Sequence, residues 1–207
     1  MTAATTETLE DIAAEIVVCP LCELARSRTH AVPGKGSAKA RIMMIGEGPG
    51  WHEDQQGEPF VGASGKFLNE LIASAGIARE DVFITNVVKC RPPANRDPLP
   101  DEMEACAPYL LRQIATIDPD VIVTLGRFSM ARFFPGERIT RIHGQAKEVG
   151  KRLVVPMFHP AAALRNGSLR PQIQEDFNKL PRLLADRERA RNKEQEQQDL
   201  PTQSTLF

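Results

Sequence analysis

The chain has 207 residues, with 26 basic and 27 acidic side chains and a formal net charge of −1. This length suits one domain with a substantial hydrophobic core, and no apolar run approaches the roughly 20 residues that a membrane-spanning helix needs. The first 15 residues hold four acids and no base. Once they and the charged stretch from Asp186 onward are set aside, the body of the chain is mildly basic. We therefore expect a soluble, cytoplasmic monomer with no membrane partner and with room for a phosphate-binding face.

Strand-like and helix-like segments alternate along the chain. The strand-like segments are short, apolar and free of polar alternation, as in parallel strands that are buried on both faces. In chain order, the expected strands are 41–46, 81–88, 121–125 and 153–158. The expected helices are 66–75, 100–117, a short one that ends at residue 133, and 171–189. This alternation predicts an α/β fold of three layers, α/β/α, with a central four-stranded parallel sheet. We expect one domain over 1–186 and, at 187–207, a charged tail that is either a fraying helix end or a flexible linker.

The stretch from Gly46 to Gly62 connects the first expected strand to the first expected helix. It is rich in glycine and proline, which lets backbone amides approach a ligand closely. It also carries Glu47, Glu53 and Asp54, which turn chemistry alone does not explain. The spacing is neither the dinucleotide fingerprint nor a P-loop. This segment therefore predicts a site for another polar ligand, and the alternative is an ordinary turn.

Three of the four expected strands end in polar segments, at 46–54, 86–96 and 159–165. In parallel sheets, ligands bind beyond the carboxyl ends of the strands. Because these ends share one edge of the sheet, we expect the three segments to form a single active site.

The four cysteines favour a metal site. Cys19 and Cys22 are separated by two residues, so both thiolates can face one ion, while Cys90 and Cys106 need a loop or helix to bring them together. A four-thiolate site can hold zinc or an iron–sulfur cluster, and spacing alone does not choose between them. The alternative is four unrelated buried thiols.

Four motifs in this order resemble the family-4 (iron–sulfur) uracil-DNA glycosylases over roughly residues 19–184. They are Cys19-Pro-Leu-Cys22; Gly46-Glu-Gly-Pro-Gly50 with Glu53-Asp54 and Pro59-Phe-Val-Gly62; Thr85-Asn-Val-Val-Lys-Cys-Arg-Pro-Pro93; and His159-Pro-Ala161. The resemblance implies a uracil-DNA glycosylase-like fold and the removal of uracil from DNA in base-excision repair. It also implies a 4Fe-4S cluster on Cys19, Cys22, Cys90 and Cys106.

The residues of these motifs suit recognition of an extruded base. Uracil must be flipped out of the duplex before its glycosidic bond can be reached. Phe60 is the candidate for stacking on it, and the amide of Asn86 can accept from N3–H while donating to O4. The backbone amides from Gly46 to Gly48 can hold the edge of the base from the other side. The alternatives are a core phenylalanine and an asparagine that caps a turn.

The departing uracil carries negative charge on O2, which a fixed donor can stabilise in the transition state. His159, at a strand end and followed by a proline, is the candidate donor. A carboxylate should orient the attacking water, and Glu47 and Glu53 are the candidates, with Asp54 third. Many other uracil glycosylases have an aspartate where this chain has Gly48, so the position of this carboxylate cannot be transferred from them.

DNA also needs contacts to its backbone, which basic side chains supply. Segment 161–165 resembles the loop that fills the gap left by the flipped base, with Leu164 or Arg165 as the wedge. The expected DNA-contacting residues are Lys89, Arg91, Arg96, Leu164 and Arg165. The basic loop at 89–93 has none of the histidine-bearing insertion with which a related branch bonds to uracil DNA, so we expect turnover.

The last five residues, Gln203 to Phe207, resemble the short peptides that dock repair proteins on a DNA sliding clamp. A glutamine anchor and a terminal Leu-Phe pair carry that likeness. Other functions stay open at this point. They are a glycosylase for another deaminated base, a non-catalytic binder of uracil-DNA or of the clamp, and a zinc-stabilised nucleotide-binding module.

Overall fold

The structure, a computed structural model, describes residues 7–199, with side chains as far as residue 193. A six-stranded sheet in the order β1-β3-β2-β4-β6-β5 forms its centre. The strands are β1 (Lys35–Gly36), β2 (Ile42–Gly46), β3 (Val82–Asn86), β4 (Val121–Leu125), β5 (Lys147–Val149) and β6 (Arg152–Met157). The four middle strands are parallel, as the sequence predicts. The sequence analysis missed β1 and β5, which pair antiparallel at the two edges, because they are two or three residues long and carry no buried apolar run.

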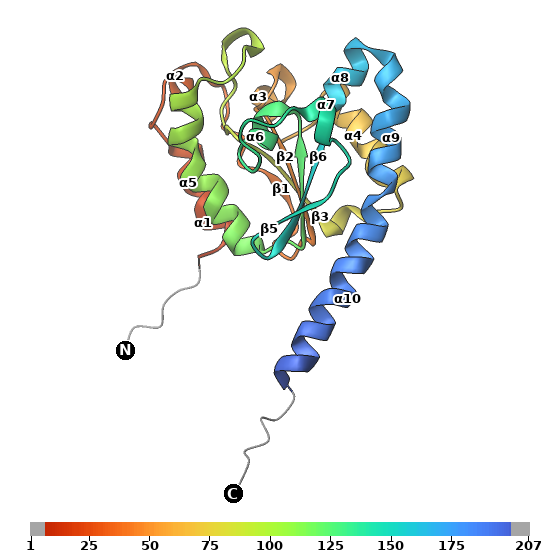
Figure 1. The fold of residues 1–207 in the computed structure, drawn as a ribbon. Helices are drawn as coiled ribbons and strands as arrows, with labels where there is room; N and C mark the ends of the chain where they lie inside the picture. The colour runs from red at the N-terminus through yellow and green to blue at the C-terminus, as the bar shows by residue number, and fades with distance from the viewer. Residues whose placement is uncertain (1–6, 200–207) are drawn as a thin grey trace, which may run out of the picture.

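Helices cover both faces of the sheet (Figure 1). They are α1 (Leu9–Val18), α2 (Leu24–Ser27), α3 (Trp51–Gln56), α4 (Ala63–Ser74), α5 (Pro100–Ile117), α6 (Arg127–Ala131), α7 (Ile139–Ile142), α8 (Pro160–Arg165), α9 (Arg170–Asn178) and α10 (Leu180–Asp199). Met43 and Ile45 of β2 belong to the core beneath α1 and α5. Ile42 and Met44 belong to the core beneath α4 and α9. Both faces of the strand are therefore buried, which explains its unbroken apolar run and gives the predicted three layers.

The C-terminal helical region differs from the single helix expected at 171–189. It divides into α9 and α10 close to Pro181, whose nitrogen has no hydrogen to donate to the preceding turn. The domain boundary expected after residue 186 falls inside α10, so no break in the chain marks it. Beyond that point Arg191 still bonds to Asp120 of the domain, with Nη1 2.9 Å from Oδ1. This contact ties α10 to the domain at Arg191, while the lower part of the helix projects beyond the sheet (Figure 1).

All four parallel strands end at the same edge of the sheet, where α3, α6, α7 and α8 gather near the top of Figure 1. The sequence analysis treated the segments at 46–62 and 159–165 as loops, yet each contains a short helix, α3 and α8. Among the described residues, none of the helices combines the length and the apolar character that crossing a bilayer requires. The strand ends and these short helices position the site.

Candidate active site

A cavity of about 520 Å³ opens at this edge of the sheet. Phe60, Asn86 and His159, which are distant in the sequence, all line it. They come from the segments that follow β2, β3 and β6, and this is the meeting of three segments that the sequence analysis expects. Other residues singled out from the sequence that reach the cavity wall are Glu47, Gly48, Glu53, Arg96 and Arg165.

Close packing fixes the aromatic wall of the cavity. The rings of Phe60 and His159 are stacked, with centroids 5.6 Å apart and planes 24° from parallel. Gly46 lies directly beneath, and a side chain there would overlap both the Phe60 ring and Asn86 Oδ1. Phe60 itself has a positive φ of 55°, an uncommon conformation for a bulky residue. The carbonyl group of Phe60 packs so closely against Gly65 that a β-carbon on Gly65 would overlap it.

The amide of Asn86 lies at the carboxyl end of β3. The residue is only 2% exposed, and its Oδ1 has no hydrogen-bond partner among the described residues. Leaving a buried acceptor unpaired costs roughly 1–3 kcal/mol. An acceptor in the wall of a cavity can recover that free energy by binding a ligand N–H group.

The position of His159 at the N-terminus of α8 fixes its tautomer. The backbone N–H of Ala161 donates to His159 Nδ1 at 3.1 Å, so in the neutral ring the proton is on Nε2. Burial, and then the positive charge of Arg165, lower the pKa of His159 to about 4. The imidazole is therefore neutral near pH 7 and offers one N–H donor.

The two carboxylates proposed to orient water have different surroundings. Glu53 is buried, and its oxygens accept from the backbone N–H groups of Val61 and Gly62, both at 2.9 Å, and of Gly50 at 3.1 Å. It braces the connection between α3 and α4. Glu47 is half-buried in the cavity wall, where burial and the nearby charge of Asp97 raise its pKa.

Asp54, the third candidate carboxylate, faces another part of the chain. It is buried, and its Oδ1 accepts from the backbone N–H of Thr29 at 2.9 Å. Asp54 is not one of the described residues that line the cavity. Asp54 therefore holds the segment before β1. Among the described residues, Glu47 is the one of the three carboxylates that lines the cavity and makes no side-chain hydrogen bond.

All four cysteines line a second, much smaller cavity between the turn after α1, the segment after β3, and α5. Cys90 and Cys106 are buried, whereas Cys19 and Cys22 are partly exposed, and none of them forms a disulfide. The backbone N–H of Lys89 donates to Cys106 Sγ at 3.3 Å, and the Arg28 guanidinium donates to Cys90 Sγ at 3.1 Å. Within the described part of the chain, no three His, Cys, Asp or Glu side chains are grouped as the ligands of a metal ion.

The four thiols nevertheless line one small cavity, and Cys19, Cys22, Cys90 and Cys106 are the residues that would hold a metal centre there. Burial raises the pKa of the Cys106 thiol to about 11, so near neutral pH this sulfur keeps its proton unless a bound metal centre displaces it. The N–H donors at Cys106 and Cys90 would stabilise the charge of the bound sulfurs.

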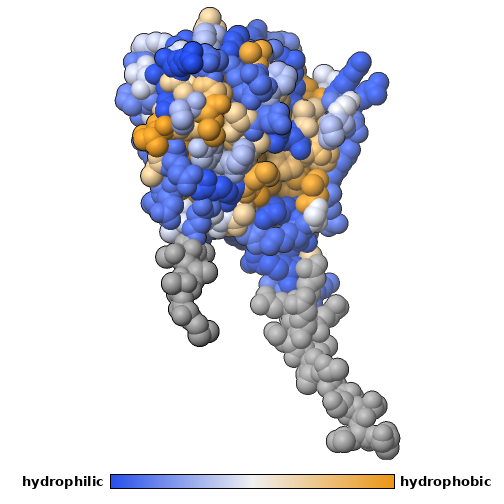
Figure 2. Space-filling view, turned by 90° about the vertical axis from the view of Figure 1, so that its left-hand side faces the viewer, coloured by the Kyte–Doolittle hydropathy of each residue, from blue (hydrophilic) through white to orange (hydrophobic). Residues whose placement is uncertain are grey.

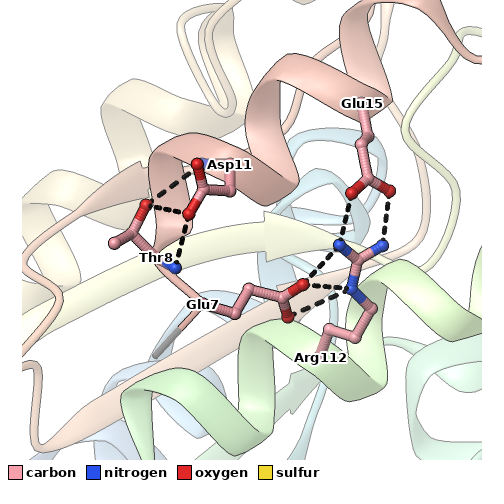
Figure 3. Close-up of polar contacts among 5 residues, drawn as sticks. All are labelled: Glu7, Thr8, Asp11, Glu15 and Arg112. Carbon is pink, nitrogen blue, oxygen red and sulfur yellow. Dashed lines mark hydrogen bonds and ion pairs between the residues drawn. The ribbon is translucent and has the colours of Figure 1, made fainter. Parts of the chain in front are cut away.

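An ion-pair cluster holds the two helices that flank the cysteines (Figure 3). The guanidinium of Arg112 on α5 bonds to both carboxylate oxygens of Glu15 on α1 at 2.6 Å, and also to Glu7. Thr8 and Asp11 cap the first turn of α1. The chain that leads to Cys19 is thus fixed against the helix that carries Cys106.

The outer side of these helices is mostly hydrophilic, with apolar patches between the charged residues (Figure 2). Val17, Val18 and Leu21, next to the cysteines, are 54%, 74% and 61% exposed.

The model of the uracil DNA glycosylase superfamily matches residues 33–182. The chain belongs to this superfamily. It is 49% identical over 186 residues to the type-4 uracil-DNA glycosylase of Archaeoglobus fulgidus, covering 86% of this chain and 94% of that one. It is 51% identical to the enzyme of the same name from Sulfurisphaera tokodaii, over 86% and 85% of the two chains. It is 46% identical to that from Thermotoga maritima, over 84% and 93%.

The residues expected to contact DNA lie in different surroundings. Arg96 and Arg165 line the cavity, and Arg96 is held by paired bonds to Glu102. Leu164, on α8, is 49% exposed. Arg91 is half-buried, and its Nε bonds to Asn95 Oδ1 at 2.7 Å.

The prediction that Lys89 contacts DNA is wrong in this structure. Its side chain is 1% exposed, and its ammonium group bonds inside the protein. The residue lies in the turn between the cavity and the cysteines, where its side chain points inward against β3 and α5.

The sequence analysis missed the contribution of the segment after β4. Arg127 lines the cavity and forms an ion pair with Asp97, which lies in the loop after β3. Ile139 and Phe158 also line it. The rule that ligands bind beyond the carboxyl ends of parallel strands applies to β4 as well, and would have drawn attention to Arg127.

Proposed function

We propose that this protein is a uracil-DNA glycosylase of the type-4 class, which hydrolyses the bond between uracil and deoxyribose and leaves an abasic site. One observation carries the proposal. Phe60, Asn86 and His159 surround a single cavity, and the Asn86 acceptor in its wall has no partner within the described chain. The identity of about half the residues with proteins named type-4 uracil-DNA glycosylases supports it.

The cavity suits uracil rather than cytosine. An extruded base would stack on the Phe60 ring, and its N3–H would donate to Asn86 Oδ1, while the amide nitrogen would donate to O4. Cytosine has no hydrogen on N3 and carries an amino group in place of O4, so it would leave the buried amide unpaired. The unpaired acceptor thereby becomes the source of base discrimination.

The reaction would use a neutral donor and a carboxylate. As the glycosidic bond breaks, negative charge develops on uracil O2, toward which the Nε2–H of His159 would donate. The sugar develops positive charge at C1′, which the Glu47 carboxylate would offset while it orients the attacking water. Because Glu53 already accepts three backbone hydrogen bonds, we assign it to bracing the loop.

DNA would be held around the mouth of the cavity. Arg96, Arg127 and Arg165 lie at the wall, and Arg91 is in the same loop as Arg96, so their positive charges would meet the phosphates beside the lesion. Leu164 projects from α8 with half its surface exposed and would fill the space that the flipped base leaves.

We also propose that Cys19, Cys22, Cys90 and Cys106 hold a 4Fe-4S cluster, with zinc as the alternative. Bound there, the cluster would supply a structural link between the chain after α1 and the segment that carries Asn86. Iron and zinc content and visible absorption of the purified protein distinguish the two. Iron with a brown colour supports the cluster, and stoichiometric zinc in a colourless protein contradicts it.

We further propose that the segment Gln203–Phe207, which lies outside the described residues, binds a DNA sliding clamp. The support is its sequence pattern. Deleting these five residues should abolish clamp binding and leave uracil release from short DNA unchanged. Clamp binding that survives the deletion rejects the idea.

We propose that the protein acts as a monomer in the cytoplasm. Light scattering tests the oligomeric state, and cell fractionation tests the location.

The main proposal is tested by measuring the release of free uracil from a labelled oligonucleotide over time. The measurement is made first with enzyme in excess and then with substrate in excess. We expect release over several turnovers from uracil-containing DNA and none from the matched cytosine duplex. Binding without release would contradict enzymatic function. Faster release from duplexes that contain hypoxanthine or xanthine would change the assigned substrate.

A further inference from the structure

Lys89 is a buried basic residue between the two sites. Its side chain is 1% exposed, and its ammonium nitrogen donates to three oxygens. These are Thr85 Oγ1 at 2.5 Å, the backbone carbonyl oxygen of Asn86 at 2.9 Å and Gln113 Oε1 at 2.7 Å. An ammonium group has three hydrogens to donate, so all of them are used.

The side chains that accept from Lys89 are themselves hydrogen-bonded to the main chain. The hydroxyl of Thr85 and the amide nitrogen of Gln113 both donate to the carbonyl oxygen of Pro33, each at 2.8 Å. The carbonyl oxygen of Lys89 accepts from the backbone N–H of Val32 at 2.7 Å. A buried charge is costly unless it is hydrogen-bonded in this way. The Lys89 ammonium is therefore held by groups that are themselves bonded to the segment before β1.

The side chain of Asn86 has the opposite character. Its Oδ1 makes no hydrogen bond within the described residues. The direction of the amide depends on the main chain of Asn86. On one side that main chain is paired with Gly46 of β2, and on the other its carbonyl is held by the Lys89 ammonium.

We propose that Lys89 is a positioning residue for uracil recognition, which holds the main chain at Asn86 so that the Asn86 amide points into the cavity. The inference rests on the proposed function. It replaces the expected contact of Lys89 with DNA by a role behind the cavity wall.

The variant Lys89→Met removes the ammonium group and keeps a side chain of similar length. We expect its single-turnover rate on uracil-DNA to fall about 10- to 100-fold, as when a reacting group is misplaced by about an ångström. Its affinity for DNA should change less than threefold, roughly the variation expected when no DNA-contacting charge is removed. Trp51, the only tryptophan of the chain and half exposed next to the cavity-lining Gly50, gives a fluorescence signal for that binding.

A double-mutant cycle separates positioning from general stabilisation. In an Asn86→Ala background there is no side-chain amide for Lys89 to orient, so Lys89→Met should lower the rate further by less than about twofold. An equal loss in both backgrounds would overturn the proposal, and so would a wild-type rate in the single variant.

Arg79→Met is the matched control. Arg79 donates to the carbonyl oxygen of Val82, at the opposite end of β3, with Nη1 2.7 Å away. This variant also removes a positive charge and a bond to the strand, and it should retain the wild-type rate. A rate loss equal to that of Lys89→Met would overturn a specific role for Lys89.

A second variant keeps the test decisive if Lys89→Met does not fold. Gln113→Met leaves Lys89 in place but removes one of its acceptors, and it should lower the rate in the same way by a smaller factor. An unchanged rate in this folded variant would count against the proposal. Wild-type protein that releases no uracil would instead contradict the proposed function, so the two failures are distinguishable.

Discussion

Two neighbouring regions at the end of β3 treat buried polar groups in opposite ways. In the network behind the strand, the ammonium of Lys89 and the groups around it are all paired. In the cavity wall in front of it, the side-chain oxygen of Asn86 has no hydrogen-bond partner in the part of the chain that the structure describes. An unpaired buried group costs stability, and we propose that a ligand completes the hydrogen bonding of Asn86. Paired groups a few ångströms away mark the support.

The same difference separates the two carboxylates of the segment after β2. The Glu53 carboxylate accepts three backbone hydrogen bonds and links the segments that precede α3 and α4. Glu47 lies half-buried beside the cavity with a raised pKa. The same type of side chain thus braces the fold at Glu53, whereas at Glu47 it lines the cavity, where we propose that it acts on the ligand.

The largest expected effect follows from removing the unpaired amide. Asn86→Ala should lower the single-turnover rate by about 10²–10³-fold, similar to the loss of one donor that stabilises a transition state. The free energy of unfolding should stay the same or rise, because the variant removes a buried acceptor that had no partner. Rate measurements and urea unfolding on the same preparation check both parts. A large loss of stability would break the comparison.

Glu53→Ala and Glu47→Gln form a pair with opposite expected results. Glu53→Ala should lower the free energy of unfolding by at least about 2 kcal/mol, since each buried donor left without a partner costs roughly 1–3 kcal/mol. Glu47→Gln should leave stability unchanged and lower the rate of uracil release. If the two variants were to exchange these outcomes, the roles assigned to the carboxylates would be reversed.

The pH dependence of stability follows from the lowered pKa of His159. In the unfolded chain this histidine takes up a proton near its ordinary pKa of about 6.5, whereas in the folded protein it does so only near 4. Between these values the unfolded state binds more protons, so this contribution to stability is complete above pH 6.5 and is lost as the pH falls toward 4. His159→Asn should remove this part of the slope in urea unfolding measured from pH 4.5 to 7.5. An identical slope in both proteins would contradict an imidazole that stays neutral in the folded protein.

The smallest expected effect concerns the ion pairs between α1 and α5. Arg112→Ala should lower the free energy of unfolding by about 1 kcal/mol, because mostly exposed ion pairs contribute little even when several are combined. For a chain of this size, that corresponds to a melting temperature lower by about 2–4 °C. The rate of uracil release should not change, since the cluster lies on the flank and not at the cavity.

Much of this arrangement could be predicted from the sequence because it follows from local patterns. The apolar runs of β2, β3, β4 and β6 define parallel strands, and the polar residues after them define the edge where the cavity lies. The two edge strands have no such pattern. No sequence pattern indicates that the Lys89 side chain points inward or that the Glu53 carboxylate accepts hydrogen bonds from backbone amides. Nor does one indicate that α10 continues past residue 186. Each of these depends on partners from distant segments, such as Gln113 for Lys89 and Asp120 for Arg191.

The hydrogen bond from the Ala161 amide to His159 links the proposed base-contacting residue to α8, the helix that also carries the proposed wedge residue. The imidazole that would face the departing base is capped onto the first turn of α8, and Leu164 projects from the next turn of the same helix. A DNA duplex that contacts Leu164 would therefore also affect the position of the imidazole, because both belong to the same six-residue helix and its cap. Deoxyuridine as a free nucleoside, which cannot press on that helix, should therefore be a poor substrate even though its base fits the same slot.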